Sequence, residues 1–172
     1  MKLRHGVITM LVLVLGVAIG WAAKRVEPSV YRSKSKQEAA RALLEQARIQ
    51  AGKGSWERIA VGRVYYLGGM KAEGQSIFDE VLGKKPDTSD KFRIAKVYYE
   101  ANEWGKAKPM FEEYARQNPK DEKGLAEIGA YYMLKGDRAA AEDLFDRSFK
   151  IESELWSTVN AAGSYLNLQP QQ

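Results

Sequence analysis

One aromatic residue recurs through the chain at a nearly constant interval. It is a tyrosine, found at Tyr65, Tyr98, Tyr132 and Tyr165, with steps of thirty-three, thirty-four and thirty-three positions. A phenylalanine follows each of the first three tyrosines by thirteen residues, at Phe78, Phe111 and Phe145. A fixed period of this length is typical of repeat proteins, in which each unit buries its apolar face only by stacking on its neighbours. The period therefore constrains the fold more strongly than any other feature of the 172 residues.

Small residues keep the same register. One lies three positions before each tyrosine, at Gly62, Ala95, Gly129 and Ala162, and another lies four positions before each phenylalanine, at Gly74, Ala107 and Ala141. Two helices can cross closely only where small side chains let their backbones approach. This pattern, with Pro86 and Pro119 closing the first two units, resembles the tetratricopeptide repeat, a 34-residue pair of antiparallel helices. The resemblance extends from about Ser55 to the C-terminus.

The resemblance implies an all-α solenoid of helical hairpins. We expect helices at residues 36–50, 55–67, 71–84, 89–101, 104–117, 122–135, 138–150 and 154–167. The first of these resembles the second helix of a unit, because its small, large and small positions hold Ala40, Leu44 and Ala47. The last resembles a first helix without a partner. The prediction is therefore three full units with a half unit at each end, in a repeat domain of residues 36–168 followed by a tail of residues 169–172.

A hydrophobic segment precedes the repeats. After a basic start at residues 1–6, residues 7–23 carry no charge. Seventeen residues are at the short limit for a membrane-spanning helix and slightly long for a cleaved signal. Trp21, followed by Lys24 and Arg25, suits the edge of a membrane. We expect one transmembrane signal-anchor, with a cleaved signal peptide as the alternative, and a basic linker at residues 24–35.

Two further expectations concern this segment. Gly16 and Gly20 form a small-xxx-small pair that would let two membrane helices pack, giving a homo- or hetero-oligomer. The basic start favours export of the repeats to the periplasmic side. Five Lys and Arg residues after the segment, against two before it, favour the cytoplasmic side. We expect export, with the cytoplasmic side as the alternative.

Charge and composition argue against several functions. The net charge of +5 is concentrated around the hydrophobic segment, where it suits anionic lipid headgroups. From Gln37 onward 20 Lys and Arg face 21 Asp and Glu, a net of −1, so a nucleic-acid partner is not expected. The chain has no cysteine and one histidine, His5, so the usual zinc and haem ligands and a nucleophile–base pair are missing. We therefore expect no catalytic residue, metal or cofactor.

The remaining candidate is a protein-binding surface. In the family, the first helices of successive units line a concave groove. Carried onto this sequence, the groove-facing positions are Trp56, Ile59, Arg63 and Tyr66, then Phe92, Lys96 and Tyr99, then Lys123 and Met133. Arg63 and Lys96 would bind acidic groups of a partner peptide, or these side chains would merely pack against their neighbours. The implied function is a membrane-anchored adaptor that aids assembly of a cell-envelope complex. The alternative is a structural subunit held by its membrane helix, with the repeats as a buttress.

Overall fold

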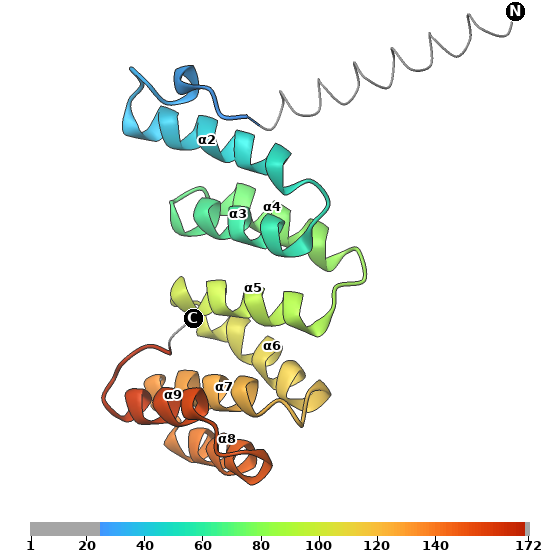
Figure 1. Cartoon of the computed structure of the whole chain (residues 1–172), viewed down its shortest axis with the longest axis vertical. Helices are drawn as coiled ribbons and strands as arrows, with labels where there is room; N and C mark the ends of the chain where they lie inside the picture. Colours follow the sequence, from blue (N-terminus) through green and yellow to red (C-terminus); the bar gives the residue numbers. More distant parts are fainter. Residues whose placement is uncertain (1–24, 171–172) are drawn as a thin grey trace, which may run out of the picture. The chain divides into compact units, whose positions relative to one another are not determined.

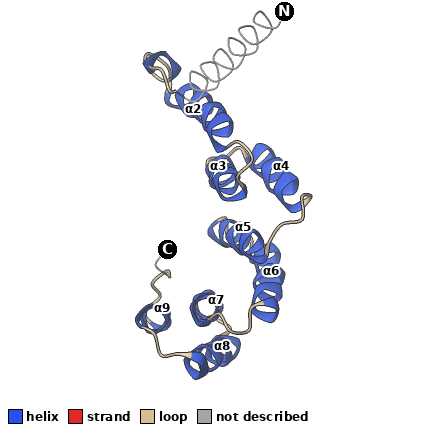
Figure 2. Cartoon of the chain, turned by 45° about the vertical axis from the view of Figure 1, so that its right-hand side comes forward, coloured by secondary structure: helices blue, strands red, loops and turns tan. Residues whose placement is uncertain are grey.

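The computed structural model describes residues 25–170, and this part of the chain is all-helical, without a strand (Figures 1 and 2). A short 3₁₀ helix, η1 (Pro28–Val30), precedes eight α-helices. These are α2 (Lys36–Ala51), α3 (Ser55–Leu67), α4 (Lys71–Leu82), α5 (Thr88–Glu100), α6 (Trp104–Gln117), α7 (Glu122–Leu134), α8 (Arg138–Ile151) and α9 (Leu155–Tyr165). Every helix expected from the sequence is confirmed to within two residues at each end.

The chain divides into two compact units between Pro86 and Asp87. The first unit contains α2 and the hairpin α3–α4. The second contains the hairpins α5–α6 and α7–α8, and α9, which packs mainly on α7. The arrangement within each unit is that of a helical-repeat solenoid.

One turn geometry closes all three hairpins. The N–H groups of Met70, Glu103 and Asp137 donate to the carbonyl oxygens of Tyr65, Tyr98 and Tyr132, at 2.9, 2.8 and 3.0 Å. The residue before each donor has a positive φ: Gly69, Asn102 and Gly136. This is the Schellman cap, which ends a helix with a left-handed residue. The repeated tyrosine is thus the residue whose carbonyl ends the first helix of each hairpin.

The small residues lie where the helices cross. A β-carbon added at Gly62 would come within 2.6 Å of the Phe78 ring. One added at Gly74 would come within 2.7 Å of the Gly62 carbonyl oxygen. Ala95 and Ala107, at the same positions in the next hairpin, are fully buried. The close crossing expected from the sequence is confirmed.

The half unit at the N-terminal side is also confirmed. Leu44 of α2 is buried against Val61, Tyr65 and Ile77 of the following hairpin, and Ala47 packs beside it. Ser35 caps α2 in a capping box with Glu38. Leu44 therefore takes the place that a phenylalanine takes in the full units.

Two cations near the starts of first helices pair with acidic residues of the second helices. Arg58 pairs with Glu80, and Lys91 Nζ lies 2.8 Å from Glu113 Oε1. Each acid is one of two adjacent acidic residues, Asp79-Glu80 or Glu112-Glu113. Each cation lies near the start of the first helix in the same hairpin. In the third hairpin, Leu125 and Arg147 occupy the same two positions, so the apolar residue has no acid opposite it. One acid of each adjacent pair, Glu80 or Glu113, therefore joins the two helices of its hairpin.

No helix among residues 25–170 is long and apolar enough to cross a membrane. The expected anchor at residues 7–23, with Gly16 and Gly20, lies outside the described residues.

Candidate functional site

The predicted groove residues of the first unit divide into buried and exposed ones. Ile59 and Tyr66 are buried in the core. The Tyr66 ring lies 5.6 Å from that of Phe78. Trp56 is 53% exposed, and Arg63 is exposed as well. Only Trp56 and Arg63 of this set are thus presented to a partner.

In the second unit the predicted residues belong to an aromatic layer. The rings of Phe92 and Tyr114 stack at 4.4 Å, and those of Tyr99 and Tyr131 lie 4.4 Å apart. Phe92 and Tyr99 are both buried. They therefore pack with their neighbours, as the alternative interpretation holds.

Lys96 already has an acidic partner in the same unit. Its ammonium lies 3.1 Å from Glu127 Oε1, and both side chains are mostly buried. The Tyr131 hydroxyl donates to the same oxygen at 2.9 Å. Burial, and then the Glu127 carboxylate, hold the pKa of Tyr131 well above its usual value. The role of Lys96 as a groove cation stays a prediction, and binding there would have to compete with Glu127.

The two predicted residues of α7 are less enclosed. Lys123 is exposed, with its ammonium 3.9 Å from Glu154 Oε1, and Met133 is half-buried. Neither contributes to the aromatic layer.

The side chain of Gln169, in the segment after α9, reaches the predicted groove. It forms a hydrogen bond with the Tyr99 hydroxyl. Burial raises the pKa of Tyr99, and this hydrogen bond lowers it. One predicted groove residue is therefore covered by the chain itself.

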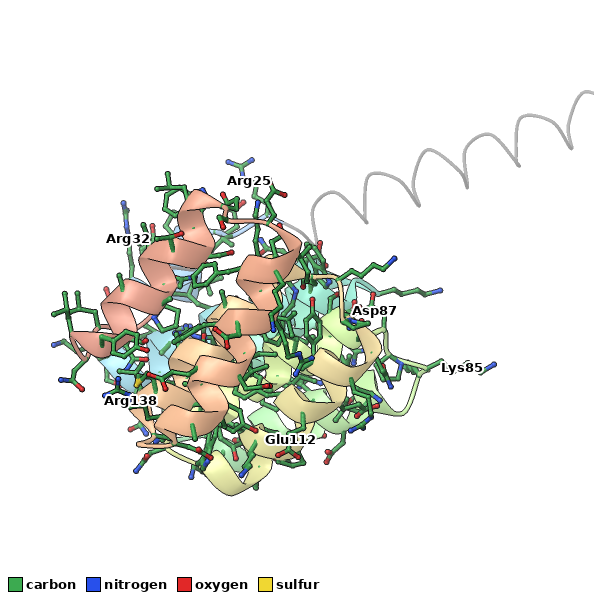
Figure 3. The ribbon with its side chains drawn as sticks, turned by 90° about the horizontal axis from the view of Figure 1, so that it is seen from below. Arg25, Arg32, Lys85, Asp87, Glu112 and Arg138 are labelled. Atoms are coloured by element: carbon green, nitrogen blue, oxygen red, sulfur yellow. The ribbon has the colours of Figure 1, made fainter. Side chains whose placement is uncertain are left out.

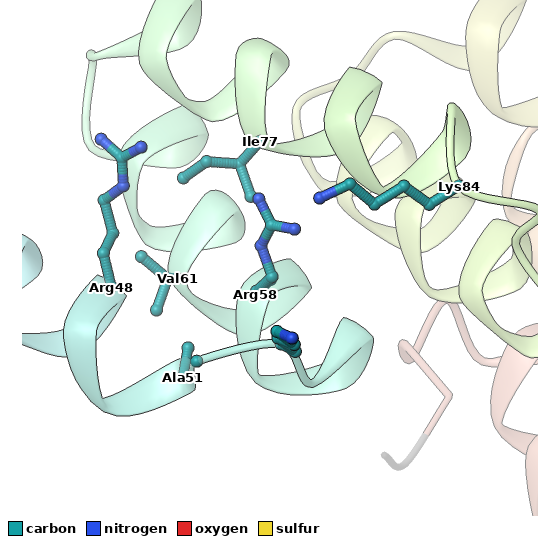
Figure 4. A pocket seen from close by; sticks show the side chains of 8 residues that line it. Arg48, Ala51, Arg58, Val61, Ile77 and Lys84 are labelled. Carbon is teal, nitrogen blue, oxygen red and sulfur yellow. The ribbon is translucent and has the colours of Figure 1, made fainter.

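The first unit contains a cavity that the sequence did not reveal. Its volume is about 380 Å³, and it lies among α2, α3 and α4 (Figure 4). Its apolar side chains are Ala51, Val61 and Ile77, and its cations are Arg48, Lys53, Arg58 and Lys84. We call it the basic cavity. The four cations come from two helices and two loops, so no short sequence motif predicts that they lie together.

Two carboxylates partly offset this charge. Glu80 pairs with Arg58, and Glu45 Oε1 lies 3.8 Å from Arg48 Nη1. Four cations against two carboxylates leave an excess of positive charge. Figure 4 shows the Lys84 ammonium pointing toward Arg58, with Ile77 and Val61 between the cations. An anionic group attached to an apolar one fits such a site.

The hairpin α5–α6 resembles a known repeat family. A family model described as tetratricopeptide repeat matches residues 91–121, which cover most of α5 and all of α6. The match and the all-helical fold support a tetratricopeptide-repeat protein. A comparison with curated proteins gave no match, and neither did one with solved structures.

A second cavity lies at the equivalent position two repeat periods later in the chain. It has a volume of about 460 Å³ and lies among α6, α7 and α8. Ala115, Ile128 and Leu144 line it, each two repeat periods after Arg48, Val61 and Ile77. Its charges are mixed: Lys108, Arg116 and Arg147 against Glu112, Asp137 and Asp143. The cavity thus recurs with the repeat, but the basic lining belongs to the first unit.

Other labelled charges point outward. Arg138 lies on the outside of the second unit, Lys85 projects from the loop after α4, and Glu112, at the edge of the second cavity, also faces outward (Figure 3). Within residues 25–170 no group of three or more histidine, aspartate or glutamate side chains could hold a metal ion.

Proposed function

We propose that this protein is a membrane-anchored adaptor that binds a partner protein, and that the basic cavity takes an acidic segment of that partner. The tetratricopeptide repeat suggests a protein–protein interaction adaptor. The observation that supports the acidic ligand is the group of four cations around an apolar floor. The anchor would be residues 7–23, the repeats would lie on the exported side, and the adaptor would aid assembly of a cell-envelope complex.

The chemistry of the cavity specifies the ligand. A carboxylate seated between Lys53 and Lys84 would gain charge-assisted hydrogen bonds, each of about 1.5–3 kcal/mol. An apolar side chain of the ligand, beside this carboxylate, would lie in the cavity against Val61 and Ile77. Such a ligand is an acidic segment with one apolar anchor residue.

The location of the cavity fits an anchored adaptor. It belongs to the unit that directly follows the basic linker, residues 24–35. Basic residues close to a membrane are drawn to anionic headgroups, at about 1 kcal/mol each. The linker would then hold the first unit near the membrane, where the components of an envelope complex are available.

Charge reversal tests the proposal. The variant Lys53→Glu with Lys84→Glu should lower partner capture from detergent-solubilised membranes at least tenfold, because two charged contacts are lost and repulsion is added. The matched control, Lys120→Glu with Lys150→Glu, changes the net charge equally at two exposed positions outside the cavity. Equal capture by both variants, with unchanged circular dichroism, would refute the cavity as the binding site. If Gly16→Leu with Gly20→Leu then abolished capture, the structural-subunit function would replace the adaptor.

A further inference from the structure

We propose that the face of the second unit around Tyr99 is a binding surface for an extended segment containing Gln-Pro, and that the chain's own residues 166–170 are its resident occupant. A partner segment would bind there only by displacing this tail. The proposal concerns a different surface from the basic cavity and does not depend on it.

The first observation is the place where α9 ends. Leu168 N–H donates to the Gly163 carbonyl at 2.9 Å, and Asn167 N–H donates to the Ser164 carbonyl at 3.1 Å. Asn167 has a φ of 60°. This is the Schellman cap that closes each hairpin. In the hairpins, however, the accepting carbonyl belongs to the repeated tyrosine, whereas here it belongs to Gly163, two residues before Tyr165.

This shift changes the direction in which the chain leaves the helix. An α-helix turns about 100° per residue. Ending two residues early therefore rotates the exit by about 200°, to nearly the opposite side of the helix. The hairpin exits lead into the second helix of the unit. The exit from α9 instead turns the chain back toward α5, as Figures 1 and 2 both show.

The second observation is what the tail contacts. Residues 165–169 are exposed, but Pro170 is buried. Gln169 beside it forms the hydrogen bond with the Tyr99 hydroxyl. Tyr99 itself is only 9% exposed. The tail therefore contacts Tyr99 through Gln169, and the residue next to Gln169, Pro170, is buried.

The residue types suit this contact. Proline has no N–H, so its burial leaves no donor unsatisfied. Proline-containing extended segments bind aromatic surfaces well because they lose little conformational entropy. The Tyr99 ring, whose hydroxyl Gln169 reaches, lies among other aromatic rings, with that of Tyr131 at 4.4 Å and that of Trp104 at 6.2 Å. The Gln169 amide supplies the one directional contact.

Covalent attachment makes the tail a competitor. A segment joined by a short connection has an effective concentration on the order of millimolar. A partner segment of similar chemistry would therefore bind weakly to the intact chain. It would bind more strongly once Gln169 and Pro170 are removed.

A synthetic peptide of residues 166–172, Leu-Asn-Leu-Gln-Pro-Gln-Gln, provides the probe. The protein is the full chain in detergent micelles, compared with the chain lacking residues 169–172, which retains the Asn167 cap. Saturation-transfer NMR should detect peptide binding to the shortened chain, with at least a fivefold smaller signal for the full chain. Tyr99→Phe in the shortened chain should reduce the signal severalfold, because it removes only the hydroxyl. A scrambled peptide controls for binding to the micelle.

The cap supplies a second, independent pair of variants. Asn167→Gly keeps the left-handed conformation accessible, whereas Asn167→Val disfavours it. In the full chain, Asn167→Val should admit the peptide and Asn167→Gly should not. The proposal is overturned if the peptide gives no specific signal with a folded shortened chain, or if it binds the shortened and full chains equally. Partner capture is measured separately. A negative peptide-binding result therefore does not bear on the proposal for the basic cavity, and a negative capture result does not bear on the proposal for the tail.

Discussion

Reversing the charge of Lys96 should destabilise the second unit, because this lysine neutralises a mostly buried glutamate. The ammonium lies 3.1 Å from Glu127 Oε1, and the two side chains are 18% and 16% exposed. Removing one partner of a fully buried pair costs about 3–5 kcal/mol. Water still reaches this pair, so we expect about 2 kcal/mol for Lys96→Met. In Lys96→Glu, two carboxylates about 4 Å apart would add up to about 4 kcal/mol of repulsion. Rotation into solvent relieves part of it, and we expect about 3–4 kcal/mol in total.

Urea unfolding followed by circular dichroism measures this effect. The control is Arg63→Glu, at the equivalent position one repeat earlier, where the residue is exposed. Surface substitutions usually change stability by about 0.5 kcal/mol or less. The charge swap Lys96→Glu with Glu127→Lys should recover at least half of the loss, because the pair is restored in reverse.

Equal destabilisation by Lys96→Glu and Arg63→Glu would refute this reasoning, and so would a charge swap that recovers nothing. Lys96 would then be a surface cation without a structural role. That result would favour the prediction that Lys96 binds a partner in the groove beside Arg63.

Two other changes test the helix crossings and the tyrosines. Gly74→Ala should cost about 1–3 kcal/mol in thermal unfolding, because its β-carbon would lie 2.7 Å from the Gly62 carbonyl oxygen. Gly105→Ala should instead stabilise by up to about 1 kcal/mol, since nothing lies within 4 Å of its β-carbon; similar shifts for both would contradict the assigned crossing. Burial, and then the hydrogen bond to Glu45, raise the pKa of Tyr65 to about 12. Because the folded state favours the neutral phenol, this contribution to stability is complete below about pH 10, the unfolded value, and is lost as the pH rises toward 12. Tyr65→Phe should therefore weaken the loss of stability between pH 10 and 12, and an unchanged pH profile would show that Tyr65 does not titrate in this range.

The packing of the half unit at α2 could be predicted from the sequence alone. Its small and large positions, Ala40 and Leu44, match the repeat, and Leu44 is buried as that match predicts. The helix bounds and the glycine at the crossing, Gly62, were likewise predictable. Each follows from periodicity along one helix or from a fixed distance along the chain, and both are properties of the sequence alone.

The partners of the charged side chains were decided by the tertiary structure. Lys96 was predicted to face a ligand but meets Glu127, 31 residues later. Arg58, near the start of α3, and Lys84, beyond the end of α4, converge on one cavity. The contacts between long side chains depend on how each helix is rotated about its axis and shifted along its neighbour. A periodic pattern does not specify this rotation or this shift to within one residue. The same holds for the tail: a cap two residues early at Gly163 sends Gln169 back to Tyr99, two repeats earlier in the sequence. A change of two residues leaves the repeat pattern intact and reverses the side of the helix from which the chain departs.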